Sequence, residues 1–156
     1  MRGCERVVAL ELTRKGFAFG VLEGEERLID WGTRECGRDV ARVLPALRSV
    51  TERYRPDRLV LEEPAGSPKK RAGRSLLAWI EQWASDFDLP VSVVERDQME
   101  RYFGVSGRYE IARRVAALFE ELRLHLPDKR RRWESERPML GAFVAIGRGL
   151  ASYRGG

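Results

Sequence analysis

The feature that most constrains this chain is an acidic residue, Glu11, at the end of an apolar run. Val7–Leu10 leads straight into Glu11, and a second apolar run, Gly16–Leu22, follows after a short break. A continuous run rich in Val and Leu is typical of a strand that is covered on both faces of a sheet. An ionised carboxylate in such a strand costs free energy unless a cation meets it. Glu11 therefore either lies at the rim of the sheet or belongs to a metal-binding cluster of carboxylates.

A second acid, Glu62, stands at the end of another apolar run, Leu59–Leu61. If these two strands lie side by side and parallel, Glu11 and Glu62 reach the same edge of the sheet. Ligands of open α/β sheets collect at the carboxyl ends of neighbouring strands. The pattern predicts that the two carboxylates lie within reach of one shared ion or water.

The remaining pattern predicts an α/β fold with five strands. The expected strands are 6–12, 17–23, 27–33, 58–62 and 90–94, and the first three form an antiparallel meander. Apolar residues at helical spacing predict helices at 40–54, from about 75, and at 97–103, 109–124 and 138–153. A meander followed by alternating helices and strands gives a mixed sheet with helices on both faces. A length of 156 residues suits one domain, 1–156.

Two local signals refine the helices. Pro45 lies inside the first expected helix and should kink it or mark a late start. Asp97–Glu100 has the spacing of a capping box, which predicts that a short helix opens at Asp97.

The composition points to a protein of the cytoplasm with a basic surface. Lys and Arg number 29 against 24 Asp and Glu, a formal net charge of +5, and arginine suits phosphate recognition. Cys4 and Cys36 are too few and too far apart for a zinc knuckle or a disulfide framework, which indicates a reducing compartment. No apolar run approaches the roughly 20 residues that span a bilayer, so no membrane partner is expected.

Three segments resemble the RuvC-type Holliday junction resolvases. Leu10–Thr13 stands where that family has its first acid-bearing strand end, Leu59–Glu62 resembles its second, and Trp133–Ala145 resembles its last-helix segment. The resemblance implies a ribonuclease H-like fold and Mg²⁺-dependent cleavage of branched DNA by metal ions held on carboxylates. It also implies a homodimer, since two symmetric cuts need two active sites.

The sequence departs from this family at two acids. Glu11 stands where the family has an aspartate, and Val144 stands where it has the aspartate of the last helix. Glu134 and Glu136 lie two or more helical turns from Val144, if that segment is helical, too far to replace the missing acid. Glu11 and Glu62 therefore remain as catalytic and metal-binding residues, and Mg²⁺ binding is expected to be weak or absent.

Two basic segments flank the expected acidic edge. They are either solvated surface or contacts to DNA phosphates, and phosphate binding should weaken steeply as salt rises. Their residues are Lys69, Lys70, Arg71, Arg74, Lys129, Arg130, Arg131 and Arg132.

Arg148 lies one helical turn beyond Val144 on the same side of the last helix. It is either a solvated side chain or a cation that leans toward Glu11 and Glu62 and stands in for missing metal charge. Two functions remain open at this point. In the first, the chain is a RuvC-like, Mg²⁺-dependent DNA endonuclease or a catalytically impaired relative that binds branched DNA. In the second, it is a non-catalytic interaction or scaffold protein that retains the ribonuclease H-like fold.

Overall fold

The computed structural model describes residues 4–62, 71–131 and 137–154, with the side chains of 71–75 and 138 excepted. One mixed sheet lies at the centre, in the order β3-β2-β1-β4-β5. Its strands are β1 (Arg6–Thr13), β2 (Gly16–Glu23), β3 (Leu28–Arg34), β4 (Arg58–Leu61) and β5 (Val91–Val93). The first three strands are antiparallel neighbours, whereas β4 pairs parallel with β1 and with β5. The predicted meander and the predicted β1–β4 pairing are both confirmed.

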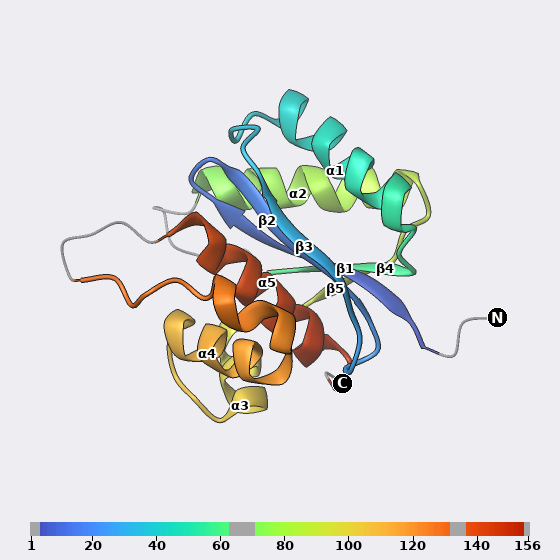
Figure 1. Ribbon diagram of the computed structural model, residues 1–156. Coiled ribbons are helices and arrows are strands. Elements are labelled where there is room, and N and C mark those ends of the chain that lie inside the picture. The colour runs from blue at the N-terminus through green and yellow to red at the C-terminus, as the bar shows by residue number, and fades with distance from the viewer. Residues whose placement is uncertain (1–3, 63–70, 132–136, 155–156) are drawn as a thin grey trace.

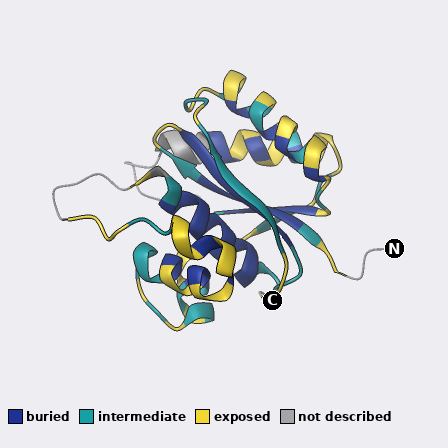
Figure 2. Ribbon diagram, viewed as in Figure 1, coloured by how far each residue is buried: buried dark blue, intermediate teal, exposed yellow. Residues whose placement is uncertain are grey.

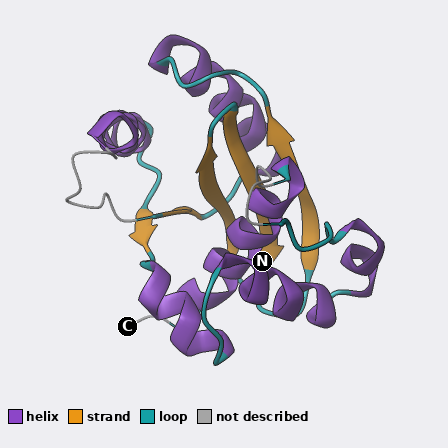
Figure 3. Cartoon of the chain, turned by 90° about the vertical axis from the view of Figure 1, so that its left-hand side faces the viewer, coloured by secondary structure: helices purple, strands orange, loops and turns teal. Residues whose placement is uncertain are grey.

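Helices cover both faces of the sheet, as Figures 1 and 3 show. One layer contains α1 (Val40–Tyr54) and α2 (Arg71–Asp86). The other contains α3 (Arg96–Phe103), α4 (Arg108–Leu118), the 3₁₀-helix η2 (Glu120–His125) and α5 (Pro138–Ser152). The arrangement matches the predicted α/β class with helices on both faces.

Side chains of β1 alternate between two separate cores. Val8 and Leu10 pack with α1 and α2, whereas Val7 and Ala9 pack with α4 and α5. Figure 2 shows the resulting burial of the strands and of α5, with exposed residues on the outer sides of α1 and α2. By the same alternation Glu11 faces α5. The fold therefore directs Glu11 toward the core that α4 and α5 cover.

Small residues let α5 approach the sheet closely. A Cβ added to Gly20 of β2 would lie 2.5 Å from Cγ1 of Ile146, and one added to Gly149 would lie 2.8 Å from Cδ1 of Leu22. Larger residues at either position would push α5 away from the strands. The close approach brings the middle of α5 within reach of Glu11.

α1 begins at Val40, as predicted, and is capped by Asp39, whose carboxylate accepts from the Ala41 amide, so Pro45 does not delay the start. Local structure differs from the prediction at the starts of two other helices. α2 begins four residues before Ser75. α3 begins at Arg96 after Glu95, so the predicted cap at Asp97 is wrong. Glu100 instead accepts from the Gly107 amide at 2.8 Å and fixes the next turn.

The predicted helix 109–124 is divided. α4 ends at Leu118, and η2 follows from Glu120, because Phe119 has an extended backbone and closes the α-helix. Among the helices in the described ranges, none has the length and apolar character that crossing a membrane requires.

Candidate functional site

Glu11 lies near the carboxyl end of β1 and is buried, with 2% of its surface exposed. The start of α5 lies over it, since a Cβ added to Gly141 would be 3.9 Å from Cγ of Glu11 and 3.2 Å from Cγ2 of Thr13. Of the two interpretations offered by the sequence, exposure at the rim is wrong. A carboxylate buried this deeply must be neutralised by its neighbours.

Arg148 of α5 provides one cation. Its Nη1 donates to Oε1 of Glu11 at 2.5 Å and to the Leu10 carbonyl at 2.9 Å, and its Nε donates to the Val94 carbonyl at 3.3 Å. The side chain is only 4% exposed. The predicted contact between Arg148 and Glu11 is therefore present. The same guanidinium also joins α5 to β1 and to the residue after β5.

A second cation, Arg108, was not anticipated from the sequence. It is the first residue of α4, and its Nη1 donates to Oε2 of Glu11, the oxygen that Arg148 leaves open. Its side chain is 27% exposed, so it forms the solvent side of the site. Only a chemical argument could have indicated a second cation. A fully buried carboxylate has two oxygens, and one arginine contact leaves the second oxygen without a hydrogen-bond donor.

These contacts decide the charge of Glu11. Burial by itself would raise the pKa of the Glu11 carboxyl, but the positive charges of Arg148 and then Arg108, with their hydrogen bonds, hold the pKa below its usual value. Glu11 is consequently ionised at neutral pH. It forms a buried cluster with the two arginines.

Glu62 follows the last residue of β4 and is half-buried. In the β1–β4 ladder Val8 pairs with Leu59 and Ala9 with Val60. Continuing that register by two residues sets Glu62 level with Glu11. The two acids therefore end neighbouring parallel strands at one edge of the sheet, and a shared role as ligands stays a prediction.

The donor set at Glu11 does not fit Mg²⁺. Val144 is 1% exposed and packs in the core with Ala9 and Val60, so α5 offers no oxygen there. Mg²⁺ requires oxygen ligands in near-octahedral geometry, and both oxygens of Glu11 already accept hydrogens from guanidinium groups. In the part of the chain that is described, no three His, Cys, Asp or Glu residues are grouped to hold a metal ion.

The two basic segments are described only in part. Lys129, Arg130 and Arg131 are exposed in the segment before α5, whose first turns pack near Thr13 and Glu11. Arg71 and Arg74 belong to the first turn of α2, the helix that follows β4. The predicted residues Lys69, Lys70 and Arg132 lie outside the described residues.

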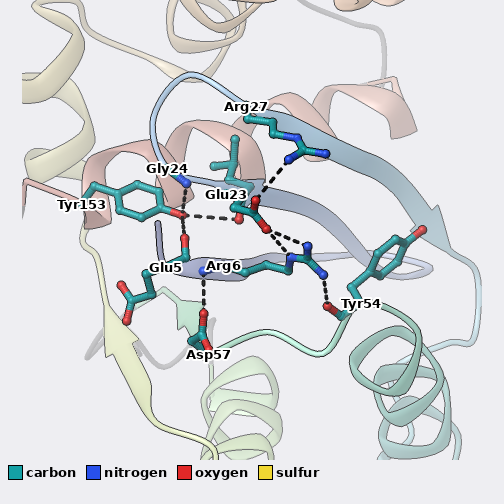
Figure 4. Close-up of polar contacts among 9 residues, drawn as sticks. Glu5, Arg6, Glu23, Gly24, Arg27, Tyr54, Asp57 and Tyr153 are labelled. Atoms are coloured by element: carbon teal, nitrogen blue, oxygen red, sulfur yellow. Dashed lines mark hydrogen bonds and ion pairs between the residues drawn. The ribbon is translucent and has the colours of Figure 1, made fainter. Parts of the chain in front are cut away.

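Another concentration of polar residues, at the opposite end of β1, is structural (Figure 4). The Arg6 guanidinium donates to Glu23 at 2.6 Å and to the Tyr54 carbonyl at 2.8 Å. The Tyr153 hydroxyl donates to the Glu5 carbonyl at 2.7 Å and accepts from the Gly24 amide at 3.0 Å. These bonds join the strand end to α1 and to the residue after α5.

Comparison with known proteins identifies the fold but no sequence relative. No family profile and no curated protein matches the chain in sequence. Among solved structures, Thermus thermophilus RuvC in complex with Holliday junction substrate matches with a TM-score of 0.68 and 16% identity over 97% of this chain and 96% of that chain. A second T. thermophilus RuvC structure matches with a TM-score of 0.65 and 18% identity, covering 96% and 95% of the two chains.

A more distant match has the same architecture. The yeast mitochondrial Holliday junction resolvase matches with a TM-score of 0.57 and 11% identity, over 96% of this chain and 81% of that chain. All three matches run through nearly the whole chain and therefore include the mixed sheet and both helical layers. The chain therefore has the ribonuclease H-like fold of the RuvC-type resolvases.

Proposed function

We propose that this protein binds branched DNA at the carboxyl edge of its sheet without cleaving it through a metal centre. The observation that carries the proposal is the occupation of both Glu11 oxygens by Arg148 and Arg108. A divalent ion would have to displace two guanidinium groups from a buried carboxylate, and it would be repelled by their charges. The arginines supply positive charge where a two-metal nuclease would hold its ions.

Charge and fold support DNA as the ligand. The chain has a net charge of +5, and Lys129, Arg130 and Arg131 are exposed in the segment that precedes α5, the helix whose start lies over Glu11. The likeness to RuvC in complex with Holliday junction substrate extends over 97% of this chain. Phosphate contacts from such residues give binding that depends on DNA shape and salt more than on base sequence.

A homodimer through α2 is part of the proposal. Trp79, Trp83 and Phe87 follow one another at four-residue steps, and Trp79 and Phe87 are 56% and 57% exposed. Exposed aromatic groups of this size in a row are typical of protein interfaces. A two-fold symmetric pair of chains matches the symmetry of a four-way junction.

The competing function is a scaffold protein in which the Glu11 cluster only stabilises the fold. An electrophoretic mobility shift assay with a labelled four-way junction separates the two, with a linear duplex of the same arm sequence as control. We expect the junction to bind more tightly than the duplex in EDTA, with no change on adding Mg²⁺ and no cleavage in Mg²⁺ or Mn²⁺. Absence of junction binding at low salt would favour the scaffold.

Cleavage of the junction would contradict the proposal that the protein binds DNA without a working metal site. Junction cutting by the unmodified chain that Glu62→Gln abolishes would show a working metal site. As a gain-of-function control, Val144→Asp combined with Arg148→Leu adds a carboxylate and removes the cation that Arg148 places on Glu11. We expect this double variant to bind Mg²⁺ measurably more tightly than the unmodified chain by titration calorimetry.

A further inference from the structure

A groove of about 580 Å³ lies between α3, α4 and the end of α5. It is lined by Tyr102, Phe103, Arg114, Ala117, Leu118 and Arg154. Arg154 bonds to Glu25 at 2.9 Å, and the neighbouring Gly24 amide bonds to the Glu5 carbonyl at the start of β1. Glu11 lies six positions along the chain from Glu5, a distance of about 20 Å in an extended strand. The groove therefore lies at the far end of β1 from the Glu11 cluster.

The aromatic floor of the groove is held in place by packing. The rings of Tyr102 and Phe103 meet edge to face, with centroids 4.7 Å apart, and Phe103 lies close against Gly147 of α5. The Tyr102 hydroxyl donates to Glu25 at 2.9 Å, and burial together with that carboxylate raises the pKa of Tyr102 to about 12. Tyr102 is therefore a neutral, fixed donor at neutral pH. A site built this way does not have to order itself on binding.

One wall of the groove is apolar and exposed. Leu118 has 58% of its surface exposed at the end of α4, whereas Val115 and Ile111 of the same helix are fully buried against α5. An exposed leucine beside a fixed aromatic floor gives an apolar side chain of a ligand a surface to cover.

The rim of the groove is cationic. Arg114 is exposed and, within the described part of the chain, has no carboxylate partner. The Arg154 side chain is 71% exposed, with only its Nε turned to Glu25. The ligand that complements this groove has negative charges on both sides of an apolar group.

We propose that the groove binds an acidic peptide segment of a partner protein, with a bulky apolar side chain on Leu118 and Phe103 and carboxylates on Arg114 and Arg154. Nucleic acid fits less well. The two rings meet edge to face and offer no flat platform for stacked bases. The inference does not depend on the proposed binding of branched DNA.

The test uses the full chain and NMR titration with a defined pool of blocked hexapeptides. Each peptide has Asp or Glu at its outer positions and Leu, Ile, Phe or Trp at its centre. We expect amide chemical shifts to change at Phe103, Ala117 and Leu118. Arg114→Glu should raise the dissociation constant at least about tenfold. The matched control, Arg113→Glu, reverses a neighbouring exposed charge that pairs with Glu110, outside the groove lining, and should change affinity less than about twofold.

Further arms separate the alternatives. A pool with Asn and Gln in place of the acids should not bind, and Leu118→Ser should weaken the acidic pool without altering the folded spectrum elsewhere. No shift at the groove with any acidic member would overturn the proposal, as would equal affinity in Arg114→Glu and the unmodified chain. Groove shifts caused by single-stranded DNA that displaces the peptides would show a nucleic-acid site instead.

Discussion

At the residue scale, the site is defined by one carboxylate and two guanidinium groups. Glu11 and Arg148 are both nearly inaccessible, whereas Arg108 is partly exposed. Paired buried charges contribute little net stability compared with apolar packing, but a single charge left behind is very costly. The cluster therefore constrains substitution much more than it stabilises the fold.

Removing one charged partner should therefore cost more stability than removing the whole charged pair. Arg148→Ala leaves Glu11 with Arg108 alone and strips two buried carbonyls of their donor, so we expect a loss of about 3–5 kcal/mol in the free energy of unfolding. Urea denaturation measures it. The double variant Glu11→Gln with Arg148→Leu, which removes both charges, should recover a large part of the loss. Arg113→Ala, at an exposed ion pair, should cost less than about 1 kcal/mol. Equal losses from Arg148→Ala and Arg113→Ala would show that the buried contact is energetically unimportant.

The lowered pKa of Glu11 predicts a dependence of stability on pH. The unfolded carboxyl titrates near its ordinary value of 4.5, and the folded one titrates below it. Between these two values the unfolded chain binds more protons, so stability falls as the pH falls. The contribution is fully present above pH 4.5 and is lost as the pH drops through the folded pKa.

Urea midpoints across this range test the sign. The stability difference between the unmodified chain and Glu11→Gln with Arg148→Leu should move in favour of the double variant on acidification. A difference that is independent of pH would mean that Glu11 titrates alike in both states.

At the scale of elements, α5 and α2 have contrasting surfaces. α5 is buried along most of its length and carries glycines where it meets β1 and β2. α2 buries Leu76, Leu77 and Ile80 but leaves aromatic groups at the surface. α5 therefore helps to build the site, whereas α2 has a surface that is free to contact another molecule.

Trp79 of α2 and Phe87, the residue after α2, predict a self-association that substitution should abolish. Trp79→Lys with Phe87→Lys places charge on the proposed interface, and we expect light scattering after size exclusion to report a monomer in place of a dimer. Leu124→Ser is the control, because Leu124 is 96% exposed but lies on η2, away from these aromatics in sequence. A monomer in the unmodified chain at the same concentration would contradict the proposed dimer.

At the scale of the whole molecule, the two ends of the sheet differ in chemistry. The carboxyl end of β1 has the acid that two arginines neutralise, and α5, whose start lies over that acid, follows an exposed basic segment; the amino end is closed by internal polar contacts (Figure 4). A polyanion is therefore expected at the first end.

Binding of a four-way junction should depend on that end alone. Replacing Lys129, Arg130 and Arg131 with alanine, or Lys69, Lys70 and Arg71, should weaken binding about equally for junctions of different sequence. It should also reduce the slope of log affinity against log salt by about 0.9 for each phosphate that the variant no longer neutralises. Alanine at Arg27, Arg48 and Arg53 removes the same charge, chiefly around the other end, and should change the slope little. Equal effects of these triple variants would indicate attraction by net charge only.

The sequence by itself determined the fold and one half of the site. Periods of two and of three to four residues distinguish strands from helices, and a parallel pair of buried strands aligns the acids that end them, so the β1–β4 edge was predictable. The position of Arg148 followed from helical spacing relative to Val144. These inferences succeed because they depend on neighbours within one element or on two adjacent strands.

Only the tertiary structure decided what neutralises Glu11. Arg108 begins a helix that lies 97 residues away in the sequence, and nothing in its local pattern distinguishes it from the chain's many exposed arginines. The helix ends that differed from prediction depend in the same way on long-range packing, such as the turn that Glu100 fixes before α4. Charge pairing in a core is set by which side chains converge after the layers pack, and the free-energy cost of an unpaired buried charge then selects the arrangement.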